Sequence, residues 1–479
     1  MLRTVGDQPS LWEAVLPDEL RRLPAELARV DALLDDPVFF APFTPLFDPR
    51  IGRPSTPMET YLRLMFLKFR YRLGFESLCR EVSDSIAWRR FCRIGLEQPV
   101  PHPTTLMKLT TRCGSVAVDG LNEALLAKAA EAKLLRCTRV RVDTTVVPSN
   151  VAYPTDAGLL AKAVGRIAAT GRRIRAAGGA TRTRLRDRSR AAGKRAHAIA
   201  SKLRSRAAAG RDEAMAAVKK ANAELADLAD TAAEEAGRLL ANAKRALRKA
   251  RTTAAQRKLD RRPDPVAGRR RGRLARAVND LEELLEATRR IAAQTRQRLA
   301  GVTPDGSTRR VSLHDPDARP IAKGRLGKPV EFGSKAQVCD NDDGIILDHD
   351  VQPGNPADAP RLEPAIKRVI KRTGRKPRTV AADRGYGEVG VEDDLHALGI
   401  RNVVVPRKGR PTKARQTAER RRGFRQTVKW RTGCEGRISH LKRTYGWDRT
   451  MIDTTEGART WIGHGVFAHN LTKIAHLTA

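Results

Sequence analysis

The segment 154–331 contains no Phe, Tyr or Trp and consists mainly of alanine, lysine and arginine. Alanine buries little apolar area, so this composition cannot build an ordinary globular core. The same residues are strong helix formers, and a thin seam of Leu, Ile, Val and Ala recurs along the segment at helical spacing. We therefore predict a coiled-coil-like helical hairpin over 155–301, interrupted at Pro263 and Pro265 and inserted into a conventional fold.

The chain is strongly basic, with 92 Lys and Arg against 54 Asp and Glu and a formal net charge of +38. More than half of this excess lies within residues 161–300. Such an excess points first to nucleic acid as the partner. No apolar run reaches the roughly 18 residues of a membrane span, and the N-terminus lacks the features of a secretory signal. We expect a soluble cytoplasmic protein associated with the nucleoid.

The first 135 residues are predicted to be helical. Ser55 or Thr56 can cap a helix that starts at Pro57, and shorter helices follow, the last of them capped by Thr104 or Thr105. Basic residues on several short helices are compatible with a helix-turn-helix-like DNA-binding domain over 1–135. A small helical bundle with a solvated basic face is the alternative.

Strand signals begin after this region and alternate with helical ones. Residues 138–147 alternate and are rich in Val and Thr, and residues 330–352 read as a hairpin across the turn at 341–344. Two further apolar strands, each preceded by a helix, and a terminal helix complete the pattern. The sequence predicts an α/β core with mixed strand pairing, formed by 136–154 and 302–479.

Two acidic residues stand at or just after apolar strand sequences. Asp143 lies inside RVDTTVV, and Asp383 directly follows TVAA. A carboxylate in a Val-rich strand is costly to bury unless it is paired or binds a cation. Each residue alone could be an exposed or turn-capping Asp, but together they favour a metal site.

A third carboxylate lies on the predicted helix 427–446. Arg431 precedes Glu435 by four residues and Lys442 follows it by seven, so the three side chains share one helix face. A carboxylate flanked by two cations suits a metal-bound phosphodiester, because the cations can hold its non-bridging oxygens. An ordinary solvated ion pair between Arg431 and Glu435 is the competing interpretation.

These three acids, in this order, resemble those of the DDE transposases of bacterial insertion sequences. The sequence DRGYG around Asp383 is similar to the family's context, and 51 residues separate Asp383 from Glu435. The interval from Asp143 to Asp383 suits the family once the insertion is removed. The helices at about 45–115 are similar to the N-terminal domain of many such transposases, and the whole is most similar to the ISNCY-type group.

The family's Tyr-Arg-Glu-Lys pattern around the third acid is matched at Arg431, Glu435 and Lys442. It departs at the Tyr position, where this chain has Val428, although Trp430 is nearby.

The resemblance implies an RNase-H-like core and a transposase that cuts at terminal inverted repeats and joins the 3′-OH ends to target DNA. It implies two Mg²⁺ or Mn²⁺ ions, and a homodimer or higher assembly on DNA. The residues implied as catalytic groups and metal ligands are Asp143, Asp383 and Glu435. Those assigned to DNA phosphates are Arg431, Lys442 and Arg384.

Two other functional classes remain open at this stage. One is a nuclease with the same core that cuts without strand transfer, and the other is a non-enzymatic basic DNA-binding protein, which would not need the three acids. Other metal sites are disfavoured: the acids at 340–343 do not have EF-hand spacing and read as turn residues. The six cysteines form no CxxC pair and are expected to be reduced, mostly buried thiols.

Overall fold

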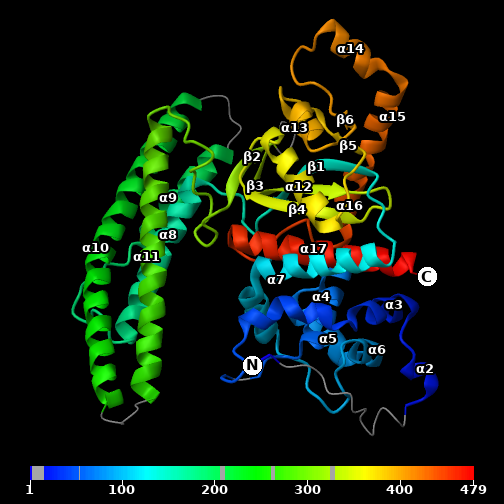
Figure 1. Ribbon diagram of the computed structural model, residues 1–479. Coiled ribbons are helices and arrows are strands. Elements are labelled where there is room, and N and C mark those ends of the chain that lie inside the picture. The colour runs from blue at the N-terminus through cyan, green and yellow to red at the C-terminus, as the bar shows by residue number, and fades with distance from the viewer. Residues whose placement is uncertain (3–15, 53, 205–210, 260–264, 324–328, 479) are drawn as a thin grey trace. The chain divides into compact units, whose positions relative to one another are not determined.

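The computed structural model describes residues 1–479 except 3–15, 53, 205–210, 260–264, 324–328 and 479 (Figure 1). The chain divides into two compact units, one made of 1–150 and 333–479 and the other of 151–332. No helix in the described part of the chain is both long and apolar enough to cross a membrane.

The second unit is built from helices, as the composition predicts. Its elements are α8 (Asp156–Ala176), α9 (Ser189–Arg204), α10 (Arg211–Leu259), α11 (Pro265–Leu299) and the short strand β2 (Arg319–Ala322). The long helices α10 and α11 pack against each other, as a hairpin requires. Two more helices, α8 and α9, pack with them, so the expected hairpin is in fact a four-helix arrangement.

The interior of this unit combines alanine with Leu, Ile and Val in similar numbers. Small side chains let helices approach closely, which is how a sequence without aromatic residues buries a continuous seam. Pro265 begins α11, as expected from its position, whereas Pro263 lies outside the described residues. The coiled-coil character of the helices stays a prediction.

The first unit contains a mixed sheet with the order β4-β3-β1-β5-β6. Its strands are β1 (Arg139–Pro148), β3 (Val330–Asp340), β4 (Ile346–Pro353), β5 (Thr379–Ala382) and β6 (Asn402–Val404). β1 runs antiparallel to β3 and parallel to β5, and β5 is parallel to β6. The predicted α/β core with mixed pairing is confirmed.

The turn between β3 and β4 also confirms its prediction. Gly344 has φ +75° and donates its N–H to Asn341 O at 3.1 Å, which closes the turn. Asp342 binds Arg139 at 2.5 Å and Asp343 binds Arg136, so both turn acids pair with arginines.

Helices connect and cover the strands. Those after β4 are η2 (Ala359–Arg361), α12 (Leu362–Thr373), η3 (Arg384–Tyr386), α13 (Val391–Ala397), α14 (Lys413–Arg420), α15 (Arg422–Arg431), α16 (Gly433–Thr444) and α17 (Thr454–Leu477). The terminal helix α17 packs against β4 and the N-terminal helices (Figure 1). Its inner residues, including His464 and His469, are buried, so α17 is a central core element.

The N-terminal region is helical, as predicted. Its elements are α2 (Asp18–Arg21), α3 (Ala25–Leu34), η1 (Pro37–Leu46), α4 (Met58–Arg70), α5 (Phe75–Asp84), α6 (Ile86–Phe91) and α7 (Pro103–Glu131). The expected caps are wrong: Pro57 occupies the N-cap of α4, and the His102 side chain accepts from Thr104 N at the start of α7. Gly114 has non-helical backbone angles and divides α7, and the part before it corresponds to the predicted short helix.

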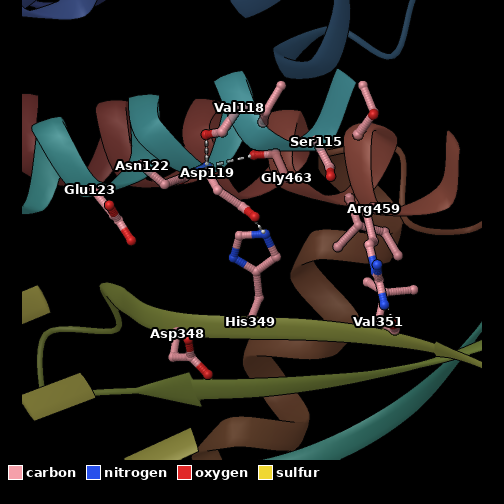
Figure 2. Close-up of polar contacts among 12 residues, drawn as sticks. Ser115, Val118, Asp119, Asn122, Glu123, Asp348, His349, Val351, Arg459 and Gly463 are labelled. Atoms are coloured by element: carbon pink, nitrogen blue, oxygen red, sulfur yellow. Dashed lines mark hydrogen bonds and ion pairs between the residues drawn. The ribbon is translucent and has the colours of Figure 1, made fainter. Parts of the chain in front are cut away.

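Helix α7 joins the N-terminal helices to α17 and the sheet. Asn122 donates to Val118 O at 3.0 Å and to Gly463 O of α17 at 3.1 Å, and His349 of β4 approaches Asp119 at 3.4 Å (Figure 2). These contacts, together with a shared hydrophobic core, place the region 1–135 and the sheet in one compact unit. The expected domain boundaries at 135/136, 154/155 and 301/302 stay predictions.

Candidate active site

The strand register brings the first two predicted acids together. In the parallel pair β1–β5, Val142 is the partner of Ala382. Asp143 and Asp383 are the next residues along the two strands, so they leave neighbouring strands at the same level. Residues 140–143 of β1 and all four residues of β5 are buried, so both faces of the sheet are covered where the two strands pair.

Asp143 is held inside the fold. Its residue is 7 % exposed, and one carboxylate oxygen accepts the Thr144 N–H at 2.8 Å. Burial raises the pKa of Asp143 to about 6, and the adjacent Arg431 guanidinium opposes that rise. The negative charges of Asp383 and Glu435 also raise the pKa of Asp143, which indicates that the three carboxylates interact electrostatically.

Asp383 begins a tight turn. Its side chain accepts the Gly385 N–H at 2.9 Å and thereby caps the short helix η3. Burial raises the pKa of Asp383, and the neighbouring carboxylate of Asp358 raises it further. Asp383 therefore caps a turn, as one interpretation of the sequence predicted, and it also lies beside Asp143.

Glu435 comes from the helical region after the sheet. The expected single helix 427–446 is divided at Thr432, where α15 ends and α16 begins. Thr432 keeps right-handed helical angles, φ −57° and ψ −19°, so Arg431 and Glu435 still face the same side. The Glu435 side chain is 61 % exposed, in contrast to Asp143.

Arg431 links the first acid to the third. Its Nη1 lies 3.0 Å from Asp143 Oδ2, and its Nη2 lies 2.9 Å from Glu435 Oε1. The guanidinium side chain is only 11 % exposed. The solvated helix pair considered from the sequence is thus only half of the arrangement, because the same arginine also neutralises a buried strand carboxylate.

The other two predicted phosphate ligands lie apart from this bridge. Lys442 donates its ammonium to the backbone carbonyl of Val146, on the strand that carries Asp143, at 2.6 Å. Arg384 is exposed, and its Nε donates to Arg407 O at 3.0 Å. Lys442 therefore fastens α16 to β1, while Arg384 extends along the surface beside Asp383.

Sequence reasoning missed a charged pair next to Asp383. Lys335 of β3 lies 2.7 Å from Asp358, and both side chains are largely buried. A β-carbon placed on Gly385 would lie 3.0 Å from Asp383 Oδ1 and 3.2 Å from Asp358 Oδ2, so the two carboxylates reach the same small space. No local motif marks Asp358, because a loop and not a strand delivers it.

The chain segment after the last strand of the sheet is strongly basic. The segment 407–425, expected to track DNA phosphates, contains α14 and the start of α15. Arg415 is used internally, pairing with Glu392 at 2.5 Å and Glu419 at 2.8 Å. Exposed cations of the segment include Arg420, Arg421, Arg422 and Arg425.

Comparison with protein families identifies two regions of the chain. A family model described as "Transposase domain (DUF772)" matches residues 16–112, and one described as "Transposase DDE domain" matches residues 302–471. The chain belongs to the DDE transposases of insertion sequences. The matched DDE region of this transposase contains Asp383 and Glu435, whereas Asp143 lies outside it.

A curated relative is the uncharacterized protein ORF8 in the nfe locus of Rhizobium meliloti. It is 29 % identical over 120 residues, which are 24 % of the transposase chain and 58 % of the relative. The match therefore spans little more than half of that relative's length. No solved structure matches the chain.

DDE transposases act on DNA and generally use divalent metal ions. The donor chemistry fits such an ion, because Asp143, Asp383 and Glu435 offer only carboxylate oxygens, the ligands that Mg²⁺ prefers. Their arrangement is not that of a preformed site: within the described residues, no group of three or more His, Cys, Asp or Glu side chains is placed to hold a metal. Instead, Arg431 stands between two of the three acids.

Proposed function

We propose that this transposase cuts DNA at the terminal inverted repeats of its element and joins the freed 3′-OH ends to target DNA. The observation that carries the proposal is the pairing of Val142 with Ala382, because it delivers Asp143 and Asp383 side by side. The contact of Arg431 with both Asp143 and Glu435 adds the third acid to the same place. The grouping with ISNCY-type elements is part of the proposal and rests on the sequence alone.

The proposed chemistry is two successive displacements at phosphorus. In the first, water attacks the phosphorus at the element's end, the bond to the 3′ oxygen breaks, and that oxygen leaves with a proton as the 3′-OH. In the second, this 3′ oxygen attacks a target phosphorus and releases a target 3′-OH. Two divalent ions, Mg²⁺ or Mn²⁺, held by Asp143, Asp383 and Glu435, would activate the attacking oxygen and stabilise the leaving one.

The cationic side chains would position the DNA. Arg384 is exposed next to Asp383, and Arg431 carries a planar fork that matches two phosphate oxygens. Lys442 supports the site in its present contact by holding α16 against β1, and it lies on the strand side where a phosphate would enter. The N-terminal helices and the basic insertion would recognise the ends, and two copies would bring two ends together.

Single alanine variants test the proposal. Asp143→Ala, Asp383→Ala and Glu435→Ala should each abolish cleavage of a duplex that carries the element's end, measured on a gel in Mg²⁺ and again in Mn²⁺. Binding of the same duplex should change little, because none of the three acids contacts DNA as a cation does. Asp342→Ala is the matched control, since Asp342 is a turn acid paired with Arg139 away from the three acids.

The outcome also separates the rival functions. Full cleavage by any one acid variant would remove that residue from the site. Cleavage without transfer of the 3′ end to a target plasmid would favour a nuclease. Binding with no cleavage by the wild-type protein would favour a non-enzymatic DNA-binding role.

A further inference from the structure

We infer that the Arg431 guanidinium occupies the position of a divalent cation between Asp143 and Glu435. DNA would vacate this position by drawing the guanidinium to a phosphate. The inference rests on the proposed function, because it takes these acids to be metal ligands. It adds a coupling to that function: in the protein without DNA, Arg431 would keep the metal site closed, and the DNA end would open it.

The geometry shows that the place is taken. Separate nitrogens of one guanidinium bind the two acids, at 3.0 Å to Asp143 and 2.9 Å to Glu435. A divalent ion bound to the buried Asp143 oxygen would lie within a few ångströms of the Arg431 positive charge, where repulsion is only weakly screened. Metal binding and the Arg431 bridge therefore compete for the same carboxylate oxygens.

The bridge is also built so that it can open. Arg431 is the last residue of α15, and Thr432 separates it from α16. Glu435 lies in the first turn of α16 with its side chain 61 % exposed, so it can change partners without unpacking the core. Among the contacts of the Arg431 side chain that the structure describes, the two ion pairs are the ones that hold it in place.

A phosphate would reach this arginine from the side of Glu435, whose side chain is 61 % exposed. Arg422, Arg425 and Lys429 are exposed on α15, on the helix face opposite Arg431. These cations would hold DNA against the helix, and a neighbouring phosphate would then meet Arg431 at the helix end. Arginine binds phosphate through two parallel hydrogen bonds, so it can exchange one oxygen pair for another without losing its bonding.

Thermodynamic linkage between DNA binding and metal binding determines the expected result. If DNA removes a competitor of the metal, DNA must strengthen metal binding, and the metal must strengthen DNA binding by the same factor. Removing Arg431 should strengthen metal binding in the absence of DNA. The coupling between the two ligands should disappear at the same time.

The test measures Mn²⁺ affinity by titration calorimetry and by the loss of the free-ion signal in electron paramagnetic resonance. A pre-cleaved end duplex with a 3′-dideoxy terminus serves as the DNA, so neither cleavage nor strand transfer occurs at that end during the measurement. Without DNA, Arg431→Gln should bind Mn²⁺ about 10-fold or more tightly than wild type, corresponding to about 1.4 kcal/mol. With DNA, wild type should gain at least about 5-fold in affinity, and Arg431→Gln should gain little.

Two variants control for charge. Lys429→Gln removes one exposed positive charge two residues away, and without DNA its Mn²⁺ affinity should stay within about 2-fold of wild type, as expected for a screened surface charge. Arg431→Lys retains the charge and should stay closer to wild type than Arg431→Gln does. Thermal melting of each variant verifies that it is folded.

The results distinguish the inference from the proposed function. If Arg431→Gln binds Mn²⁺ no more tightly than Lys429→Gln, the inference is wrong. The proposed function would still stand if Asp143→Ala weakens Mn²⁺ binding. If Asp143→Ala leaves Mn²⁺ binding unchanged even in the Arg431→Gln background, the acids are not metal ligands, and the proposed function itself is overturned.

Discussion

Val142 of β1 pairs in parallel register with Ala382 of β5, and this single pairing sets the level at which the two strand acids emerge. Asp143 remains within its strand and is buried, whereas Asp383 starts a turn. The two carboxylates therefore share a location but have different surroundings. That difference has consequences that can be measured without any substrate.

The stability of the metal-free protein should fall as the pH rises through the titration of Asp143. Burial raises the folded-state pKa of Asp143 from the ordinary 3.8 to about 6, so the folded state binds this proton more tightly than the unfolded chain does. The resulting stabilisation is complete below about pH 4 and is lost as the pH rises through about 6. Between those limits, wild type should lose on the order of 2 kcal/mol more than Asp143→Asn, which does not titrate.

Urea unfolding at pH 4.5 and pH 7.5 measures this difference. Asp18→Asn is the matched control, because its side chain is 81 % exposed, and its pH dependence should follow that of wild type. Equal pH dependence in Asp143→Asn and wild type would mean that the ion pair with Arg431 fully offsets the burial of the carboxylate.

Gly114 should not accept alanine without a loss of stability. It interrupts the helix with φ +64° and ψ −174°, which an L residue rarely adopts, and an added β-carbon would lie 3.2 Å from Glu456 Oε1. The kink presents Ser115 N to Glu456 at 2.7 Å, so straightening it would also disturb the packing of α7 against α17. Gly114→Ala should cost about 1–2 kcal/mol of unfolding free energy, measured in urea.

Gly423→Ala provides the comparison in the same unit. Gly423 lies in α15, and no atom approaches its β-carbon position within 4 Å, so alanine there should be neutral or slightly stabilising. If Gly114→Ala and Gly423→Ala both had the melting temperature of wild type, the prediction would be wrong, because α7 would then accept alanine at its kink at no cost in stability.

Much of the fold could be predicted because local patterns determine it. The alternation in 138–147, the turn at 341–344 and the alanine-rich composition of the insertion each limit the chain to one kind of element. All six cysteines are free and buried, as their spacing indicates. The helix caps are harder to predict, because Pro57 fixes its own backbone angle and leaves no role for a preceding hydroxyl.

In the candidate site, too, the residues marked by local sequence patterns could be predicted and the others could not. The two strand acids follow apolar strands, so their sequence context marks them. The second contact of Arg431, with Asp143, joins residues 288 positions apart and has no local signature. The approach of Asp358 to Asp383 likewise depends on where a loop folds back and on its pairing with Lys335. Such contacts emerge only when the register and the helix break are known together.

The insertion should be removable, and its removal should weaken the electrostatic part of DNA binding. Asp156 at the start of α8 accepts from Gln294 at 3.1 Å and from Arg298 at 3.2 Å, both near the end of α11, so the two ends of the helical segment lie close together. Replacing 156–299 with a short Gly/Ser linker should therefore leave the sheet and its register intact. Each DNA phosphate that the shortened protein no longer neutralises should reduce the slope of log K against log salt by about 0.9.

A milder variant separates charge from structure in this experiment. Arg269, Arg289 and Arg290 are exposed on α11, and changing all three to Gln keeps the helices while removing three positive charges. If the insertion follows DNA, the triple variant should reduce the salt slope partway and the deletion should reduce it further, both measured by fluorescence anisotropy on one duplex. If both proteins keep the wild-type slope while the deletion alone changes the sedimentation coefficient of the DNA complex, the helices serve assembly of the transposase, and their positive charge does not contribute to DNA affinity.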